Sequence, residues 1–201
     1  EERARKFADK LTKIRHTCDY NIFGTRTGRL TTNKNSFPIL TMDKKYRKII
    51  KPNNDWLVSL DFNGAELRTF LALAGISQPN VDVHEWNRTN AYNKIGDREE
   101  VKERFFAWLY NPSSSDTVSG NIYGSSRKVV FDEYFNNDVV KTPFGREIAS
   151  DEYHAMSYLI QSTCSDIVLR QMIKLNNYLK NKKSFVAFCV HDEVVLDITD
   201  S

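Results

Sequence analysis

Apolar residues recur at two different spacings along the first part of the chain. From Glu1 to about Cys18 they are three or four residues apart, which predicts an amphipathic helix. Trp56 to Phe62 is instead a short and mostly apolar run, as is typical of a buried strand, and helical spacing follows from Ala65 to Ala74. Gly75 is a favourable residue for ending that helix. The pattern therefore predicts a strand that leads directly into a helix.

The second part of the chain contains two longer helical patterns separated by polar stretches. One runs from Asp97, a good N-cap residue, to Tyr110, and the other from about Asp151 to Lys180. The stretch 76–96 is polar and punctuated, and the stretch 113–126 is rich in Ser, Asn and Gly, which predicts a loop at 113–126.

The chain closes with two apolar runs, Phe185 to Val190 and Glu193 to Ile198, joined by His191 and Asp192, which predicts a β-hairpin. Asp192 thus follows a strand, as Asp61 follows Val-Ser-Leu in the earlier run. A buried carboxylate normally needs a cation, and two carboxylates that converge from different strands suit a hard ion such as Mg²⁺. Taken alone, either aspartate is more simply explained as an exposed turn residue or a salt-bridge partner.

Composition restricts the class of protein. The 201 residues are 40% hydrophobic, enough for one globular domain or one domain with an inserted lobe. No run of eighteen apolar residues and no signal-peptide pattern is present, so we expect neither membrane insertion nor secretion. The three cysteines are far apart without CxxC spacing, which favours an intracellular, reducing compartment, the cytoplasm if the source is bacterial or a phage. A net charge of +3 is too small to indicate nucleic-acid binding.

Four stretches carry recognisable patterns. They are TGRLTT at 27–32, LDFNGAELR at 60–68, the spacing RxxxKxxxFxxxY formed by Arg98, Lys102, Phe106 and Tyr110, and VHDE at 190–193. In this order they resemble the motif set of family A (Pol I-like) DNA polymerases, including viral or phage-type members. Weaker similarities lie between them at Asp82–His84, Thr142–Arg146 and Gln161.

The resemblance implies an α/β fold. We expect the right-hand palm of a polymerase, an antiparallel sheet flanked by helices, at 1–75 and 141–201, with shortened helical fingers at 76–140. No thumb is recognisable. The implied function is a DNA-directed DNA polymerase core that adds dNTPs to a primer 3′-hydroxyl with two metal ions and releases pyrophosphate.

The resemblance also assigns the chemistry of the metal site. Asp61 and Asp192 would bridge two Mg²⁺ ions, or Mn²⁺ as a substitute, and the carbonyl of Phe62 would complete one coordination sphere. Lys102 would act as general acid toward the departing pyrophosphate. Glu193 would support the site electrostatically without touching a metal.

The nucleotide would be held by a gently winding stripe, because residues four apart drift by about 40° on a helix. Arg98 and Lys102 would meet phosphates, and Phe106 and Tyr110 the base and sugar. Glu66 would exclude a 2′-hydroxyl and hydrogen-bond Tyr110. The remaining candidate nucleotide contact is His84, at a triphosphate oxygen, although a surface histidine is an equal alternative.

Contacts with primer-template DNA are implied for three further residues. Arg29 and Gln161 would hydrogen-bond the minor groove at the primer terminus, where acceptors are similar for every base pair, and His191 would approach the primer end. The implied partners are therefore primer-template DNA, dNTPs and further polymerase domains or a processivity factor, with no membrane.

Several positions depart from the family pattern. Gly64 stands where the family has Gln, Asn111 where it has Gly, and Tyr153 and Ser157 where it has Arg and Asn. The stretch 110–142 is also short, which suggests a fragment or a compact viral or phage enzyme.

Three alternative functions stay open. A single-subunit phage-type RNA polymerase shares the aspartates and the Arg/Lys/Tyr helix, but Glu66, Phe106 and Glu193 argue against it. A non-catalytic nucleic-acid-binding remnant would not need both aspartates and Lys102. A metal-dependent nuclease would not need the stripe.

Overall fold

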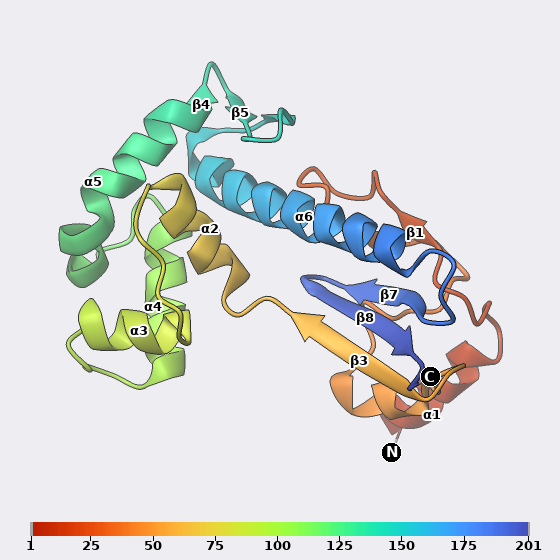
Figure 1. The fold of residues 1–201 in the computed structure, drawn as a ribbon. Helices are drawn as coiled ribbons and strands as arrows, with labels where there is room; N and C mark the ends of the chain where they lie inside the picture. The colour runs from red at the N-terminus through yellow and green to blue at the C-terminus, as the bar shows by residue number, and fades with distance from the viewer. Residues whose placement is uncertain (1, 201) are drawn as a thin grey trace. The chain divides into compact units, whose positions relative to one another are not determined.

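The computed structural model describes residues 2–200, so Glu1, where the first predicted helix begins, and Ser201 lie outside it. The described chain folds into two compact units (Figure 1): unit 1 comprises residues 2–61 and 167–200, and unit 2 comprises residues 62–166. The helix after the first long strand, and the first half of the last helix, pack into the core of unit 2. The boundaries at 75/76 and 140/141 stay predictions. The names palm and fingers stay predictions.

Unit 1 is built on an antiparallel sheet of three strands in the order β3-β8-β7 (Figure 1). These are β3 (Trp56–Asp61), β7 (Phe185–Val190) and β8 (Glu193–Ile198). The predicted hairpin is confirmed, with His191 and Asp192 as its two-residue turn. His191 has a φ of 57°, the left-handed conformation that tight hairpin turns require. The other elements are α1 (Glu2–Leu11), β1 (Tyr20–Asn21), β2 (Thr31–Thr32), the 3₁₀ helix η1 (Lys44–Ile49) and the second part of α6 (Glu152–Leu179).

The prediction that the run from Trp56 forms a buried strand is correct for the strand and wrong for its burial. Trp56 is 59% exposed, Leu60 is 42% exposed, and Asp61 is exposed as well. The reason is topological, since β3 pairs only with β8 and therefore forms one edge of the sheet.

The N-terminal helix is shorter than predicted, because α1 ends at Leu11 instead of Cys18. Beyond Leu11 the backbone forms hydrogen bonds with a distant segment instead of within a helix. The amide of Arg15 donates to the carbonyl of Asn35, and the amide of Phe37 donates to the carbonyl of Thr17. Tertiary hydrogen bonds have thus replaced the helical ones. The segment is fixed to the sheet by the hydroxyl of Tyr20, which donates to the carbonyl of Cys189 at 2.6 Å.

The far end of the sheet is held by a buried carboxylate. Asp197 is 2% exposed and accepts hydrogen bonds from the backbone amides of Asn53, at 2.6 Å, and Asn54, at 2.9 Å. A buried charge is tolerated only when it is paired or hydrogen-bonded. Asp197 therefore joins β8 to the segment that enters β3.

Unit 2 is mainly helical. Its elements are α2 (Ala65–Leu73), α3 (Val83–Asn90), α4 (Arg98–Tyr110), α5 (Thr117–Tyr134), the strands β4 (Phe135–Asn136), β5 (Val139–Lys141) and β6 (Glu147–Ala149), and the first part of α6 (Glu152–Leu179). The three strands form a small antiparallel sheet in chain order. The helices share one core of buried apolar side chains, in which the aromatic rings of Phe70, Phe105 and Tyr123 lie within 6.0 Å of one another.

Two helices of unit 2 were not predicted. Residues 83–90 form α3, whose N-cap is the carboxylate of Asp82 accepting from the amide of Glu85, and residues 117–134 form α5, whose N-cap is Asp116. The first part of α5 lies in the stretch 113–126, which composition predicted as a loop. In α5 the burial of Ser119, Tyr123 and Val130 against the core outweighs the low helix propensity of its Ser and Gly residues.

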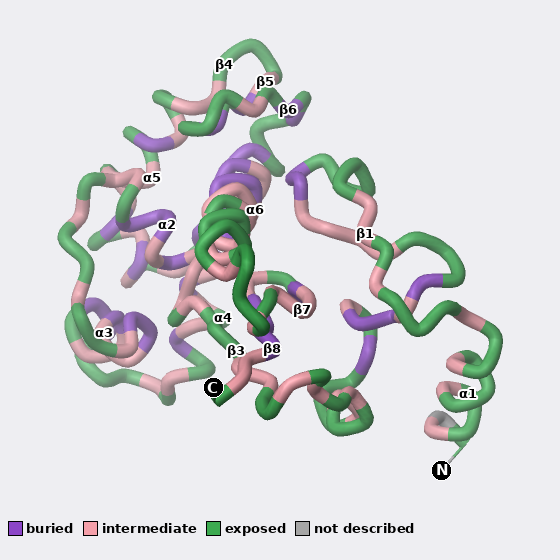
Figure 2. Tube along the Cα trace, turned by 45° about the vertical axis from the view of Figure 1, so that its right-hand side comes forward, coloured by how far each residue is buried: buried purple, intermediate pink, exposed green. Residues whose placement is uncertain are grey.

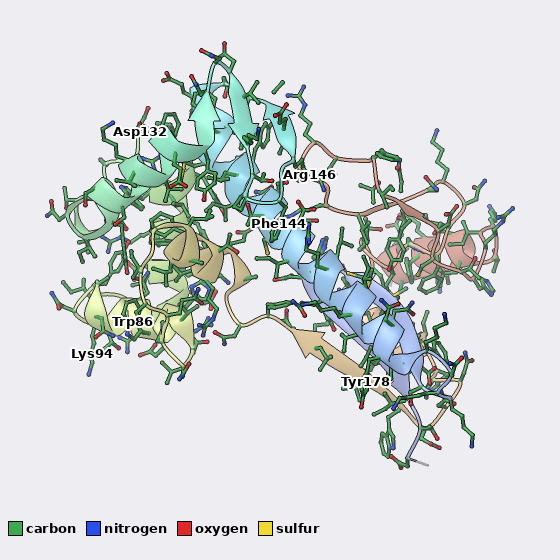
Figure 3. All side chains as sticks on the ribbon, turned by 45° about the horizontal axis from the view of Figure 1, so that its top comes forward. Trp86, Lys94, Asp132, Phe144, Arg146 and Tyr178 are labelled. Carbon is green, nitrogen blue, oxygen red and sulfur yellow. The ribbon has the colours of Figure 1, made fainter. Side chains whose placement is uncertain are left out.

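The last helix agrees with its prediction, since α6 runs from Glu152 to Leu179. Its first half carries buried residues and its last turns are exposed (Figure 2). Ile173 is 57% exposed, and the labelled Tyr178 is 70% exposed (Figure 3). Arg146, also labelled, follows the β5–β6 turn and its Nη2 lies 2.6 Å from Asp166 Oδ1 on α6.

Two expectations from composition can be compared with the fold. Within residues 2–200 no helix combines the length and the apolar character needed to span a bilayer. All three cysteines, Cys18, Cys164 and Cys189, carry free thiols.

Candidate functional site

Three carboxylates lie at one end of the sheet in unit 1. Asp61 is the last residue of β3 and is the direct register partner of Glu193, the first residue of β8. Asp192 immediately precedes Glu193 in the hairpin turn. We call Asp61, Asp192 and Glu193 the carboxylate cluster. The two strands that were expected to bring the aspartates together do place them at the same end of one sheet.

The premise of the metal prediction needs a correction. Asp61 is exposed and Asp192 is half-buried, so neither is the buried charge that the apolar strands suggested. What remains is their proximity, and hard carboxylate oxygens from adjacent strands suit Mg²⁺. Among residues 2–200 no three His, Cys, Asp or Glu side chains form a group able to hold a metal ion. The donor set for the predicted ions is therefore two carboxylates and the backbone, and coordination by the Phe62 carbonyl stays a prediction.

Glu193 is not available as a third ligand of this kind. Arg47 Nη1 lies 2.9 Å from its Oε2, and Ser59 Oγ donates to its Oε1 at 2.6 Å. Burial, together with the negative charges of Asp192 and Glu193, raises the pKa of the Cys189 thiol to about 11. Arg47 and Ser59 were not identified from sequence, because their pairing with Glu193 joins segments far apart in the chain.

All four residues of the predicted stripe lie on α4 and are half-buried. Asp97 caps the helix by accepting from the amide of Glu100, as its position in the sequence predicted. The rings of Phe106 and Tyr110 stack at 5.7 Å with an angle of 21° between their planes. The ring of His84 meets Phe106 edge-on at 5.8 Å. The structure thus brings His84 to the aromatic part of the stripe.

Glu66 also joins the stripe. The hydroxyl of Tyr110 donates to Glu66 Oε2 at 2.9 Å, which confirms the predicted hydrogen bond. The residue before α2 explains one departure from the family pattern. Gly64 has a φ of 60°, and a Cβ there would lie 2.3 Å from Val83 Cγ1, so no larger residue fits without a shift.

Carboxylates accompany both cations of the stripe. Arg98 Nη2 lies 2.9 Å from Asp82 Oδ2, and Lys102 Nζ lies 3.2 Å from Glu99 Oε2. The hydrogen bond from Arg98 is the main reason why the pKa of the Asp82 carboxyl is held well below its usual range. Asp82 was noted only as part of a weak sequence similarity, and its capping pattern with Glu85 is the signal that could have identified it.

His84 is not a surface histidine. It is 6% exposed, and its Nδ1 is buried with no hydrogen-bond partner among the described residues. Burial is the main cause that lowers the pKa of the His84 imidazole, and the positive charges of Arg98 and Lys102 lower it further. The neutral ring is therefore favoured. Contact with a triphosphate oxygen stays a prediction.

The stability of unit 2 is expected to depend on pH through His84. Since the pKa of His84 is lower in the folded chain than its unfolded value of about 6.5, the unfolded chain binds the extra proton as pH falls. The free energy of unfolding should therefore decrease from pH 7 to pH 5, by at most about 1.4 kcal/mol per pH unit for one proton. Urea unfolding of His84→Gln should show a flatter pH dependence than that of the wild type. A slope unchanged by His84→Gln would contradict this assignment.

A small pocket adjoins the aromatic end of the stripe. Its volume is about 360 Å³, and it is lined by Phe106, Ala107, Tyr110, Asn111, Tyr153, His154 and Ser157. Three positions that depart from the family pattern, Asn111, Tyr153 and Ser157, thus line one pocket. Whatever binds beside Tyr110 meets a surface different from that of the family.

The three predicted DNA-contacting residues lie on separate elements. Arg29 lies between β1 and β2, where its carbonyl accepts from Thr25 Oγ1 at 2.9 Å. His191 is exposed in the β7–β8 turn, and Gln161 is half-buried on α6. Their contacts with DNA stay predictions. A separate cavity of about 780 Å³ in unit 1 has a mainly apolar lining that includes none of the predicted site residues.

The fold, mixed α/β with small antiparallel sheets, is similar to that of a DNA polymerase domain. One similar structure is the POL domain of Pol1 from M. smegmatis, solved in complex with DNA primer-template and dNTP; the TM-score is 0.79 at 16% sequence identity. The match covers 100% of this chain and 45% of that chain, so this chain spans less than half of its length. No protein-family model and no curated protein matches the sequence.

Proposed function

We propose that this chain carries the catalytic core of a DNA-directed DNA polymerase that adds dNTPs to a primer 3′-hydroxyl. The single observation that carries the proposal is the register pairing of Asp61 with Glu193, which puts Asp61 beside the turn that holds Asp192. The similarity in fold to a DNA polymerase domain supports the same reaction class, nucleotidyl transfer.

The proposed metal ligands are Asp61, Asp192 and the Phe62 carbonyl. Two Mg²⁺ ions, when bound there, would activate the attacking hydroxyl and stabilise the leaving oxygen. The chain's own contribution is geometric, since an antiparallel pair and a two-residue turn determine where both carboxylates lie.

The proposed nucleotide contacts are Arg98 and Lys102 for the phosphates and Phe106 and Tyr110 for the base and sugar. Because both cations already have carboxylate partners, a triphosphate would have to replace Asp82 and Glu99 as the partner. Lys102, once released from Glu99, can donate a proton to the departing pyrophosphate. Neutral His84 can contact a phosphate oxygen only as a hydrogen-bond donor.

Primer extension with Mg²⁺ and a labelled primer-template tests the proposal. The expected result is extension with dNTPs and little extension with rNTPs. Efficient use of rNTPs by the wild-type chain would favour the RNA-polymerase alternative, and release of nucleotides without dNTPs would favour the nuclease. DNA binding with neither reaction would favour a non-catalytic module.

Glu66 is expected to select the sugar. Removing its side chain opens the space beside Tyr110, so Glu66→Ala should raise rNTP relative to dNTP incorporation on the order of 10- to 100-fold. Tyr110→Phe, which removes the hydroxyl that donates to Glu66, should change the ratio in the same direction but less. The exposed Glu103→Ala on α4 is the matched control. Competition between one dNTP and its rNTP measures the ratio, and a ratio unaltered in Glu66→Ala would remove Glu66 from this role.

A further inference from the structure

Arg47, which lies outside the β7–β8 hairpin, pairs with Glu193 of the carboxylate cluster. The side chain of Arg47, in η1, is 24% exposed and that of Glu193 is 22% exposed, so the pair is largely shielded from water. Arg47 Nη1 donates to Glu193 Oε2, and Ser59 Oγ donates to Oε1. With both of its oxygens engaged, the Glu193 carboxylate is held in one orientation.

That orientation points away from the two aspartates. Ser59 lies on the same face of β3 as Asp61 but two residues farther from the end of the strand, and its register partner is Val195. A hydrogen bond to Ser59 therefore draws Glu193 along the sheet, toward its interior. Directly opposed like charges such as Asp61 and Glu193 repel each other, and the pairing with Arg47 offsets that repulsion.

We propose that Arg47 is a positioning residue that keeps Glu193 out of the coordination of the metal ions held by Asp61 and Asp192. This inference rests on the proposed function. Mg²⁺ in such sites is bound through one or two carboxylates and keeps its other positions for water and substrate phosphates. A released Glu193, opposite Asp61, would take one of those positions and add a negative charge.

Stability alone does not account for an arginine here. Its Nε is buried and has no hydrogen-bond partner among the described residues, which costs free energy. A lysine could pair with Glu193 without such a donor. What arginine adds is a rigid, planar donor group that holds the carboxylate in one orientation.

The test measures Mn²⁺ affinity without DNA or nucleotide, by the EPR signal of free Mn²⁺. Arg47→Met keeps an apolar side chain of similar length. This variant should bind Mn²⁺ more tightly, on the order of tenfold, because one more carboxylate charge would lie about 4 Å from the ion. It should also extend primers more slowly at saturating Mn²⁺. Arg47→Met/Glu193→Gln should return to wild-type affinity, Glu193→Gln alone should bind no more tightly than wild type, and Arg47→Lys should fall between wild type and Arg47→Met. Lys48→Met, an exposed neighbour in η1 with the same loss of charge, is the control.

The possible results distinguish the proposed role of Arg47 from the proposed metal site itself. Tighter Mn²⁺ binding cannot result from partial unfolding, so it supports the positioning role directly. Equal affinities for wild type, Arg47→Met and the double variant, with binding still lost in Asp61→Asn, would overturn the role of Arg47 and leave the metal site intact. Wild-type binding that does not depend on Asp61 would overturn both.

Discussion

Replacing Asp61 with alanine is expected to lower the rate of Mg²⁺-dependent primer extension by at least about 1,000-fold. A carboxylate that bridges two metal ions contributes several kcal/mol to transition-state stabilisation, and about 4 kcal/mol corresponds to this factor. Single-turnover extension of a labelled primer at saturating dNTP measures the rate. Asp9→Ala, which removes an exposed carboxylate from α1, should retain wild-type activity. Extension by Asp61→Ala at close to the wild-type rate would refute the metal assignment.

The same variant separates loss of chemistry from loss of fold. Asp61 is an exposed residue at the end of β3, so Asp61→Ala should still unfold cooperatively without metal. Mn²⁺ should raise the midpoint of the wild type, because a ligand that binds only the folded state stabilises it, and should do so much less for Asp61→Ala. A lower midpoint without metal would show that the side chain has a structural role.

Replacing Phe105 with alanine is expected to destabilise unit 2 by about 3–5 kcal/mol, the usual cost of removing a buried phenylalanine ring. Phe105 is fully buried, and its ring lies 5.6 Å from Tyr123, 5.9 Å from Trp108 and 6.0 Å from Phe70. These partners come from three helices, so little local rearrangement can fill the cavity. Urea unfolding followed by tryptophan fluorescence measures the change.

Phe23 supplies the control for this prediction. It is 87% exposed, and Phe23→Ala should change the free energy of unfolding by less than about 0.5 kcal/mol. A loss below about 1 kcal/mol in Phe105→Ala would mean that the core described for unit 2 is not formed in solution. Because α4 carries both Phe105 and the stripe, this variant should also lose nucleotide binding in proportion to unfolding.

Much of the candidate site could be predicted from local pattern. The hairpin around Asp192 and the helix that carries Arg98 to Tyr110 occur where alternation, spacing and capping residues placed them. The hydrogen bond between Tyr110 and Glu66 was also correct, although that expectation came from the family resemblance and not from physical periodicity.

The wrong predictions share one cause, which is that contacts distant in sequence outweighed local preference. The first helix ends early because Arg15 and Thr17 exchange backbone hydrogen bonds with residues of a distant segment. The α5 helix forms despite its composition because Tyr123 and Val130 are buried in the core. Trp56 is exposed because β3 is an edge strand of its sheet. The order of strands in a sheet cannot be predicted from a hydropathy pattern.

By itself, the sequence determined the types of most elements and the identities of the reactive groups, because spacing, caps and turn residues act within a few positions of one another. The tertiary structure alone decided which groups are paired. It set the exposure of Asp61, the burial of His84, the partnership of Arg98 with Asp82 and the capture of Glu193 by Arg47 and Ser59. The physical reason is that charge pairing and burial depend on distance in space, and Arg47 and Glu193 are 146 residues apart in the chain yet 2.9 Å apart in the fold.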